Sequence, residues 1–197
     1  MSETRGVFGL EDIIEQKLEN EWVLLEDVWL EPSFPGTGYF GGGFAPTATG
    51  RTSSMEKTTY ASDTTAAVPG ANLTAEVSEF AGTGNSTHGY FGGGRNPSTT
   101  AQMDKVTYAS DTTAAVPGAN LTAARYLLAA TGNSTHGYFG GGRPGSFSTM
   151  DKTTYSSDTT AAVPGANLSA ARHALAASSS RANALPTTSS SSTPVIV

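Results

Sequence analysis

The chain has no cysteine among its 197 residues, and only 14 % of its residues are charged. The absence of cysteine excludes a disulfide framework, a thiolate metal site and a cysteine nucleophile. No apolar run is long enough to span a bilayer, so we expect no membrane insertion. The N-terminus is acidic where a secretory signal needs an apolar run, and no export signal is predicted. Large apolar side chains are too few for a helical core, which favours short strands joined by tight turns.

Charge of one sign is concentrated at one end. Nine of the 17 acids, but only two of the 11 bases, lie within residues 1–31, and the remainder is almost neutral. Neither part offers a basic stripe for phosphates, so we expect no nucleic-acid partner. The composition predicts an acidic N-terminal anchor segment over residues 1–35, a repeat region over 36–177 and a Ser/Thr-rich flexible tail over 178–197.

The acidic segment contains a helical pattern of apolar residues over 10–19, followed by a stretch rich in Trp, Val and Leu. An amphipathic helix of about ten residues is marginal alone in water and needs a surface to cover. Two interpretations stay open: the segment packs on the first repeat, or it docks on another protein. The candidate anchor residues are Leu10, Ile13, Ile14, Leu18, Trp22 and Trp29.

The motif GYFGGG occurs three times, at 38–43, 89–94 and 137–142. A nearly identical stretch of sequence follows each copy. Tyr60, Tyr108 and Tyr155 mark the register, with steps of 48 and 47 residues. A repeat of this length indicates one supersecondary unit copied in tandem, and each copy needs a neighbour to bury its apolar face.

Each repeat is predicted to form four strands. Pro-Gly and Gly-Asn pairs supply the turns between them. The fold class is therefore all-β, with tandem four-stranded units. In the middle copy the predicted strands are His88–Gly92, Gln102–Ala109, Thr112–Val116 and Arg125–Thr131.

The loop after each triple glycine is the variable part of the repeat, spanning 44–54, 95–102 and 143–149. A tolerated insertion indicates a solvent-exposed loop. Either this loop determines a binding specificity, or its sequence varies neutrally because no partner contacts it.

Residues that could carry chemistry are sparse. His88 and His136 share one repeat position without partnering acids, which is typical of a surface residue and not of a metal ligand. In each repeat one aspartate (Asp63, Asp111 or Asp158) precedes Thr-Thr, where an Asx turn accounts for it without calcium. No Lys-Ser/Thr follows the triple glycines, so nucleotide binding is rejected. We expect no catalytic residue, metal or cofactor.

A unit read from Arg125 resembles the kelch repeat: an aromatic-Gly-Gly strand, a strand ending at Tyr155 with Asp158 after it, and a proline at Pro164. This resemblance implies four-stranded propeller-like blades. The tryptophan that usually follows the Asp-Thr turn is missing, and Arg125 is replaced by Val77 in the first complete copy. The repeat-defining positions are Tyr39, Phe40, Tyr90, Phe91, Tyr138, Phe139, Arg125 and Arg172.

The exact sequence of the repeat, together with the N-terminal segment RGVFGLEDIIEQ, resembles kelch-like virion structural and tail-fibre proteins of marine cyanophages. That resemblance implies a non-enzymatic virion component, on the tail more than the capsid. Its partners would be other virion proteins and a host-surface glycan. The alternatives are a carbohydrate-binding or carbohydrate-acting propeller and a capsid decoration protein.

The chain also carries an incomplete fourth copy, which begins at Arg172 and breaks off after Ala177. Three copies and an orphan strand would leave sheet edges bare, which invites pairing with another chain. We therefore expect a homo-oligomer, and we favour a trimer over a dimer.

Overall fold

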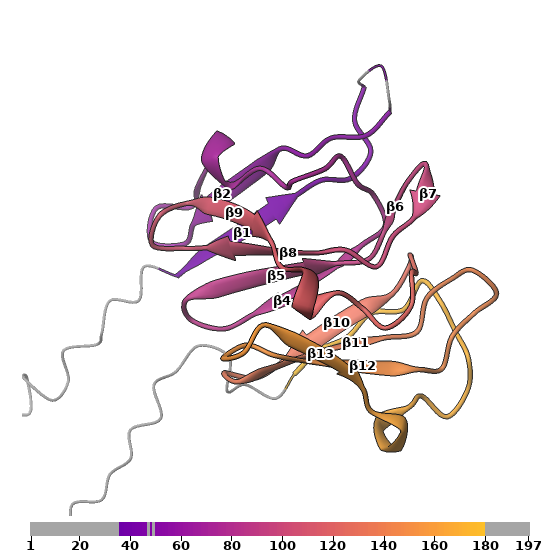
Figure 1. Cartoon of the computed structure of the whole chain (residues 1–197). Coiled ribbons are helices and arrows are strands. Elements are labelled where there is room, and N and C mark those ends of the chain that lie inside the picture. Colours follow the sequence, from indigo (N-terminus) through magenta and orange to yellow (C-terminus); the bar gives the residue numbers. More distant parts are fainter. Residues whose placement is uncertain (1–35, 47, 49, 180–197) are drawn as a thin grey trace, which may run out of the picture.

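The computed structural model describes residues 36–46, 48 and 50–179 (Figure 1). The predicted helix, with all six candidate anchor residues, lies outside them, as does most of the predicted tail. In the described part, regular structure consists of strands and short 3₁₀ helices, which confirms the all-β prediction. The elements are β1 (Thr37–Gly41), β2 (Met55–Thr59), β3 (Thr64–Ala67), η1 (Pro69–Ala71), β4 (Ala81–Gly84), β5 (His88–Gly92), β6 (Arg95–Asn96), β7 (Ser98–Thr99), β8 (Met103–Thr107), β9 (Thr112–Ala115), η2 (Pro117–Ala119), β10 (Ala129–Gly132), β11 (His136–Gly140), β12 (Met150–Thr154), β13 (Thr159–Ala162) and η3 (Pro164–Ala166).

The strands form one antiparallel sheet per repeat, and the sheets follow one another in space as in the sequence (Figure 1). We call them the first unit (β1-β2-β3), the second unit (β4-β5-β8-β9) and the third unit (β10-β11-β12-β13). The pairing register is the same in each: Phe91 opposes Asp104 and Phe139 opposes Asp151. Among the described residues the first unit contains no counterpart of β4. The variable loop of the second unit adds the small hairpin β6-β7.

Strand bounds agree with prediction in three of four cases. β5 matches, and β8 and β9 lie inside the predicted ranges. The range Arg125–Thr131 is wrong at its start, because the strand β10 begins only at Ala129. It is also wrong in its sheet, because β10 pairs with β11 of the third unit and is not the fourth strand of the middle copy. Leu127 adopts a left-handed backbone conformation with φ of +54°, which no extended strand contains, and Arg125 is fully buried.

The triple glycines make a close approach between chain segments possible. Gly93 has φ of +75°, a conformation that favours glycine, and a Cβ there would lie 2.6 Å from the carbonyl oxygen of Arg125. The next glycine, Gly94, donates its backbone N–H to that same oxygen at 2.8 Å. The last two glycines of the motif thus allow the chain to pack against the segment at which the following unit begins.

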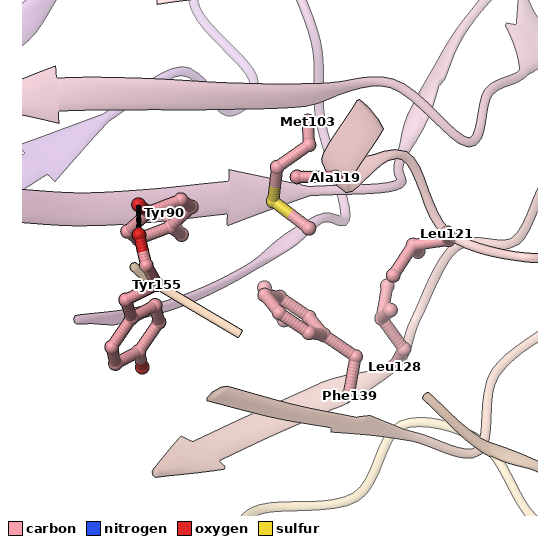
Figure 2. Packing of buried hydrophobic residues seen from close by; sticks show 8 residues of the cluster. Tyr90, Met103, Ala119, Leu121, Leu128, Phe139 and Tyr155 are labelled. Carbon is pink, nitrogen blue, oxygen red and sulfur yellow. Dashed lines mark hydrogen bonds between the residues drawn. The ribbon is translucent and has the colours of Figure 1, made fainter. Parts of the chain in front are cut away.

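The apolar core lies between units and not within one sheet. One cluster joins the second and third units, where Phe139 points toward Met103 while Leu121 and Leu128 close the side (Figure 2). A second cluster, containing Met55 and Val106, joins the first and second units. Each sheet therefore depends on its neighbour for burial, as the repeat length indicates.

Candidate functional site

The contact between successive units, which we call the seam, contains the same polar cluster at both places where it occurs. At the first seam the Tyr39 hydroxyl donates to the Asp111 carboxylate, and Lys57 Nζ lies 2.8 Å from Asp111 Oδ2. At the second seam Tyr90 donates to Asp158 Oδ1 at 2.5 Å, and Lys105 pairs with the same carboxylate. We name this tyrosine–lysine–aspartate group the seam clamp. One unit supplies its two donors and the next unit its acceptor.

The acceptor side is positioned by a tight turn between two strands. Asp111 and Asp158 both have φ of +50°, and Asp63 of the first unit has φ of +49°. Aspartate tolerates this left-handed conformation better than most side chains. The turn therefore holds each carboxylate at the edge of its sheet, facing the preceding unit.

Stacked tyrosines accompany the clamp. Tyr39 and Tyr108 have ring centroids 4.9 Å apart, and Tyr90 and Tyr155 have theirs 4.7 Å apart (Figure 2). Stacking leaves Tyr155 only 8 % exposed, whereas its equivalent in the first unit, Tyr60, is 58 % exposed. Among the described residues, no tyrosine stacks on Tyr60.

The clamp shifts the ionisation of its members. The hydrogen bond between Lys57 and Asp111 raises the pKa of the lysine and lowers that of the carboxyl group. Burial alone would raise the pKa of Asp158, but the hydrogen bonds from Lys105 and Tyr90 outweigh burial and lower it. These directions favour a charged carboxylate and lysine across the neutral pH range.

Two further contacts complete each seam. At the second seam, Thr160 Oγ1 donates to the carbonyl oxygen of Ala119 at 2.6 Å, and Gly118 lies so close that a Cβ would be 2.8 Å from the carbonyl oxygen of Asp158. Thr113 and Gly70 make the equivalent contacts at the first seam. The 3₁₀ turn of one unit thus packs on the aspartate turn of the next.

Within the described residues, the array ends in a half-complete seam on each side. Asp63 is exposed, and among the described residues its side chain has no partner. At the other end Tyr138 and Lys152 occupy the donor positions, and within residues 36–46, 48 and 50–179 neither side chain forms a hydrogen bond or ion pair. A Cβ at Gly165, the equivalent of Gly118, would meet nothing within 4 Å.

The predicted repeat-defining residues have several different roles. Tyr39 and Tyr90 are clamp donors, and Tyr138 has the same position without an acceptor. Phe139 is fully buried, whereas Phe40 is 63 % exposed. Phe91 packs edge-on against Phe80. Arg125 is buried with Asp151, and Arg172, which opens the incomplete fourth copy, is exposed.

Sequence reasoning missed the functional pairing of the lysine and the aspartate. The interpretation of the aspartate as an Asx-turn residue described its backbone but not its partners. The available signal was the recurrence of a lysine, an aspartate and two tyrosines at the same positions of every repeat. Their partners are 53 to 72 residues away in the chain, so no local pattern joins them.

The two repeat histidines lie near the second seam, on a groove that Lys105 and Asp158 also line. Each histidine Nδ1 shares a hydrogen bond with the preceding threonine hydroxyl at 2.8 Å. Burial, followed by the charge of Lys105, lowers the pKa of His88. In the part of the chain that the structure describes, no three His, Cys, Asp or Glu residues are grouped so that they could hold a metal ion.

Among the described residues, no helix has the length and apolar character needed to cross a membrane. Neither a family model nor a curated protein matches this chain. The arrangement that recurs and is left incomplete at both ends is the seam, and we treat its two open ends as the candidate functional site.

Proposed function

We propose that this chain is a non-enzymatic structural protein of a phage virion, a tail-fibre or tail-associated component. It docks through its N-terminal segment and presents its β-units, as propeller-like blades, for assembly or for contact with the host surface. The similarity of the repeat sequence to cyanophage virion proteins supports a role in the virion. The half-complete seams support the assembly role.

The observation that carries the assembly role is the complementarity of the two ends. The first unit exposes an acceptor, Asp63, together with the face of Tyr60. The third unit presents the donors Tyr138 and Lys152 and the open turn at Gly165. These are the same groups that meet at both internal seams, so a second copy of the chain completes them. Opposite charge at the two ends also favours this contact over contact between like ends.

Such a contact is head-to-tail, because the two joined surfaces differ. Head-to-tail contacts give closed rings when the rotation between copies closes, and open filaments when it does not. Propellers close with roughly four to eight blades, more than the three units of one chain supply. Two copies of a three-unit chain supply six units, which lies within that range. The trimer that we favour supplies nine units, so its three chains would wind into a fibre instead of closing as one propeller.

Sedimentation of the full chain over a range of concentrations tests the assembly role. We expect the wild-type chain to associate, and Asp63→Asn and Gly165→Ala each to sediment as monomers with an unchanged far-ultraviolet spectrum. An equimolar mixture of the two variants should form heterodimers only, since each retains one functional end. Association of both variants at the wild-type level would refute the seam contact. A wild-type chain that stays monomeric at high concentration would refute the assembly role itself.

The docking role is tested in particles. Replacing Ile13, Ile14 and Leu18 together with Asp removes the apolar face of the predicted helix. We expect the repeat region to fold and purified particles to lack the protein. Particles that carry normal amounts of the variant would mean that the N-terminal segment is only a packing element of the first unit. A wild-type chain that is absent from particles would contradict the virion role.

A further inference from the structure

The third unit contains a built binding site for a guanidinium group, and the group that fills it is its own Arg125. This side chain is fully buried. Its Nη1 donates to the carbonyl oxygen of Thr149 at 3.0 Å and to Thr149 Oγ1 at 2.9 Å. Its Nη2 donates to the carbonyl oxygen of Phe139 at 3.2 Å and to Asp151 Oδ2 at 2.7 Å. We call these acceptors the guanidinium cage.

The second unit lacks the arginine, and it retains the carboxylate and main-chain carbonyl positions of the cage but not the Thr149 hydroxyl. Val77 stands at the position of Arg125, and Phe91, Gln102 and Asp104 stand where the third unit has Phe139, Thr149 and Asp151. All four line a cavity of about 150 Å³. Cavities of roughly this volume hold a molecule the size of benzene, so a guanidinium group fits.

The cavity is negatively charged. Asp104 is only 5 % exposed and accepts hydrogen bonds from the Thr74 backbone N–H at 2.8 Å, from the Thr74 hydroxyl at 2.7 Å and from Gln102 Nε2 at 3.1 Å. Glu76 also lines the cavity, where the third unit has an alanine, Ala124. Among the described residues, neither carboxylate forms a salt bridge. A buried carboxylate without a cation is costly, so Asp104, with the half-buried Glu76 beside it, makes the cavity favour a positive ligand.

The entrance also differs between the units. In the third unit the Phe147 ring lies 5.9 Å from Arg125 Cζ and covers the cage. The corresponding loop of the second unit contributes Asn96, Ser98 and Thr100 to the cavity lining, and no aromatic ring. Small polar side chains leave a route by which a ligand from solvent can reach Asp104.

We propose that the cavity of the second unit binds the guanidinium group of an external ligand in the place that Arg125 fills in the third unit. The planar guanidinium has several donors in a fixed fork, which suits a carboxylate flanked by carbonyl oxygens. A metal ion is a poorer match, because the cage offers one carboxylate and two main-chain carbonyls, whereas hard cations take six or more oxygens. The site is separate from the seam clamp and does not depend on the assembly role.

Methylguanidinium chloride is the probe, titrated into the full chain and followed by amide resonances in two-dimensional NMR. Saturable shifts are expected for Thr74, Val77 and Gly93, with tetramethylammonium chloride at equal ionic strength giving none. Glu76→Ala keeps the buried Asp104 and its hydrogen bonds. It should weaken binding by a factor of about two to ten, as expected for a partly screened charge.

A matched control copies the third unit into the second. The triple variant Glu76→Ala, Val77→Arg and Gln102→Thr supplies an internal arginine, so saturable binding should disappear while the melting temperature rises. Arg125→Ala is the converse and should gain a second methylguanidinium site. Shifts that do not saturate, or that persist unchanged in the triple variant, would overturn the proposal and leave the cavity as a packing defect.

The source of the guanidinium is separated by a second probe. Acetyl-arginine methylamide presents the side chain in a peptide setting. If it binds at least as well as methylguanidinium, the ligand is an arginine of a polypeptide. If only methylguanidinium binds, the site takes a small free guanidine, because the loop from Asn96 to Thr100 excludes a backbone.

Discussion

The aspartate of each repeat has the same neighbours in sequence and the same backbone conformation in all three units, and only its surroundings differ. Asp111 and Asp158 each accept hydrogen bonds from a tyrosine and a lysine of the preceding unit, while Asp63 is exposed. One residue type thus provides its own control within a single chain. The comparison isolates what the seam clamp contributes to stability.

Asp158→Asn should lower the free energy of unfolding by about 1–2 kcal/mol. A hydrogen bond to a charged group is worth roughly 1.5–3 kcal/mol, and the partial exposure of this pair reduces that value. Asparagine tolerates the left-handed turn, so the backbone is unaffected. Urea denaturation, at a concentration where the chain is monomeric, measures the change.

The matched variant is Asp63→Asn, which should change the stability of the monomer by less than about 0.5 kcal/mol, as for other surface substitutions. An equal loss in the two variants would mean that the aspartate acts through its own turn and not through the clamp.

The 3₁₀ helices are the elements through which one unit touches the next. η1 and η2 each place a glycine against the aspartate turn of the following unit, and η3 places Gly165 in open space. The Pro-Gly pairs predicted a turn at each place. That the turn is also a packing surface depends on the neighbouring unit, which the local sequence does not specify.

Gly118→Ala should destabilise the chain by about 1–3 kcal/mol, the usual range for overpacking a well-packed contact. The added Cβ would lie 2.8 Å from the main-chain carbonyl oxygen of Asp158, which has little freedom to move. Thermal unfolding followed by circular dichroism measures the effect, and Gly70→Ala repeats the test at the first seam.

Gly165→Ala is the control for this element. It meets no neighbour, so the monomer should be unaffected or stabilised by up to about 1 kcal/mol through the lower entropy of the unfolded chain. A melting temperature that falls as far in Gly165→Ala as in Gly118→Ala would contradict the assigned role of the seam contact.

The whole molecule is held together at seams that contain most of the buried tyrosines. Burial raises the pKa of Tyr108 to about 12 and also raises the pKa of Tyr90 and Tyr155. A folded pKa above the unfolded value of 10.0 means that the stabilisation is complete below pH 10. It is lost as the pH rises from there through the folded pKa.

We therefore expect stability to be level between about pH 7 and 9 and to fall steeply above about pH 10. Urea denaturation at a series of pH values measures this profile. Tyr108→Phe should make the alkaline fall shallower. Tyr60→Phe, at the exposed equivalent position, should leave it unchanged. Identical profiles for the wild type and Tyr108→Phe would contradict the assignment of the alkaline loss to this seam.

Much of the fold was accessible from the sequence because its signals are local. The repeat of Tyr60, Tyr108 and Tyr155 set the unit boundaries, and glycine and proline pairs set the turns. The strand beginning at Arg125 was misplaced, because the left-handed backbone conformation of Leu127 gives no signal in the composition. The candidate site was less accessible: the clamp tyrosines were named only as repeat markers, and Lys57, Lys105 and their aspartates were not paired.

By itself the sequence determined the number of units, their all-β character and the position of most strands, since side-chain alternation and turn residues act over a few neighbouring positions. Only the tertiary structure decided which side chains meet. The clamp joins residues 53 to 72 positions apart, and their distance depends on how one sheet stacks on the next. The empty cage beside Val77 has the same origin. The loss of an arginine is visible in the sequence, but the cavity it leaves exists only because Phe91, Gln102 and Asp104 keep the places that their counterparts hold around Arg125.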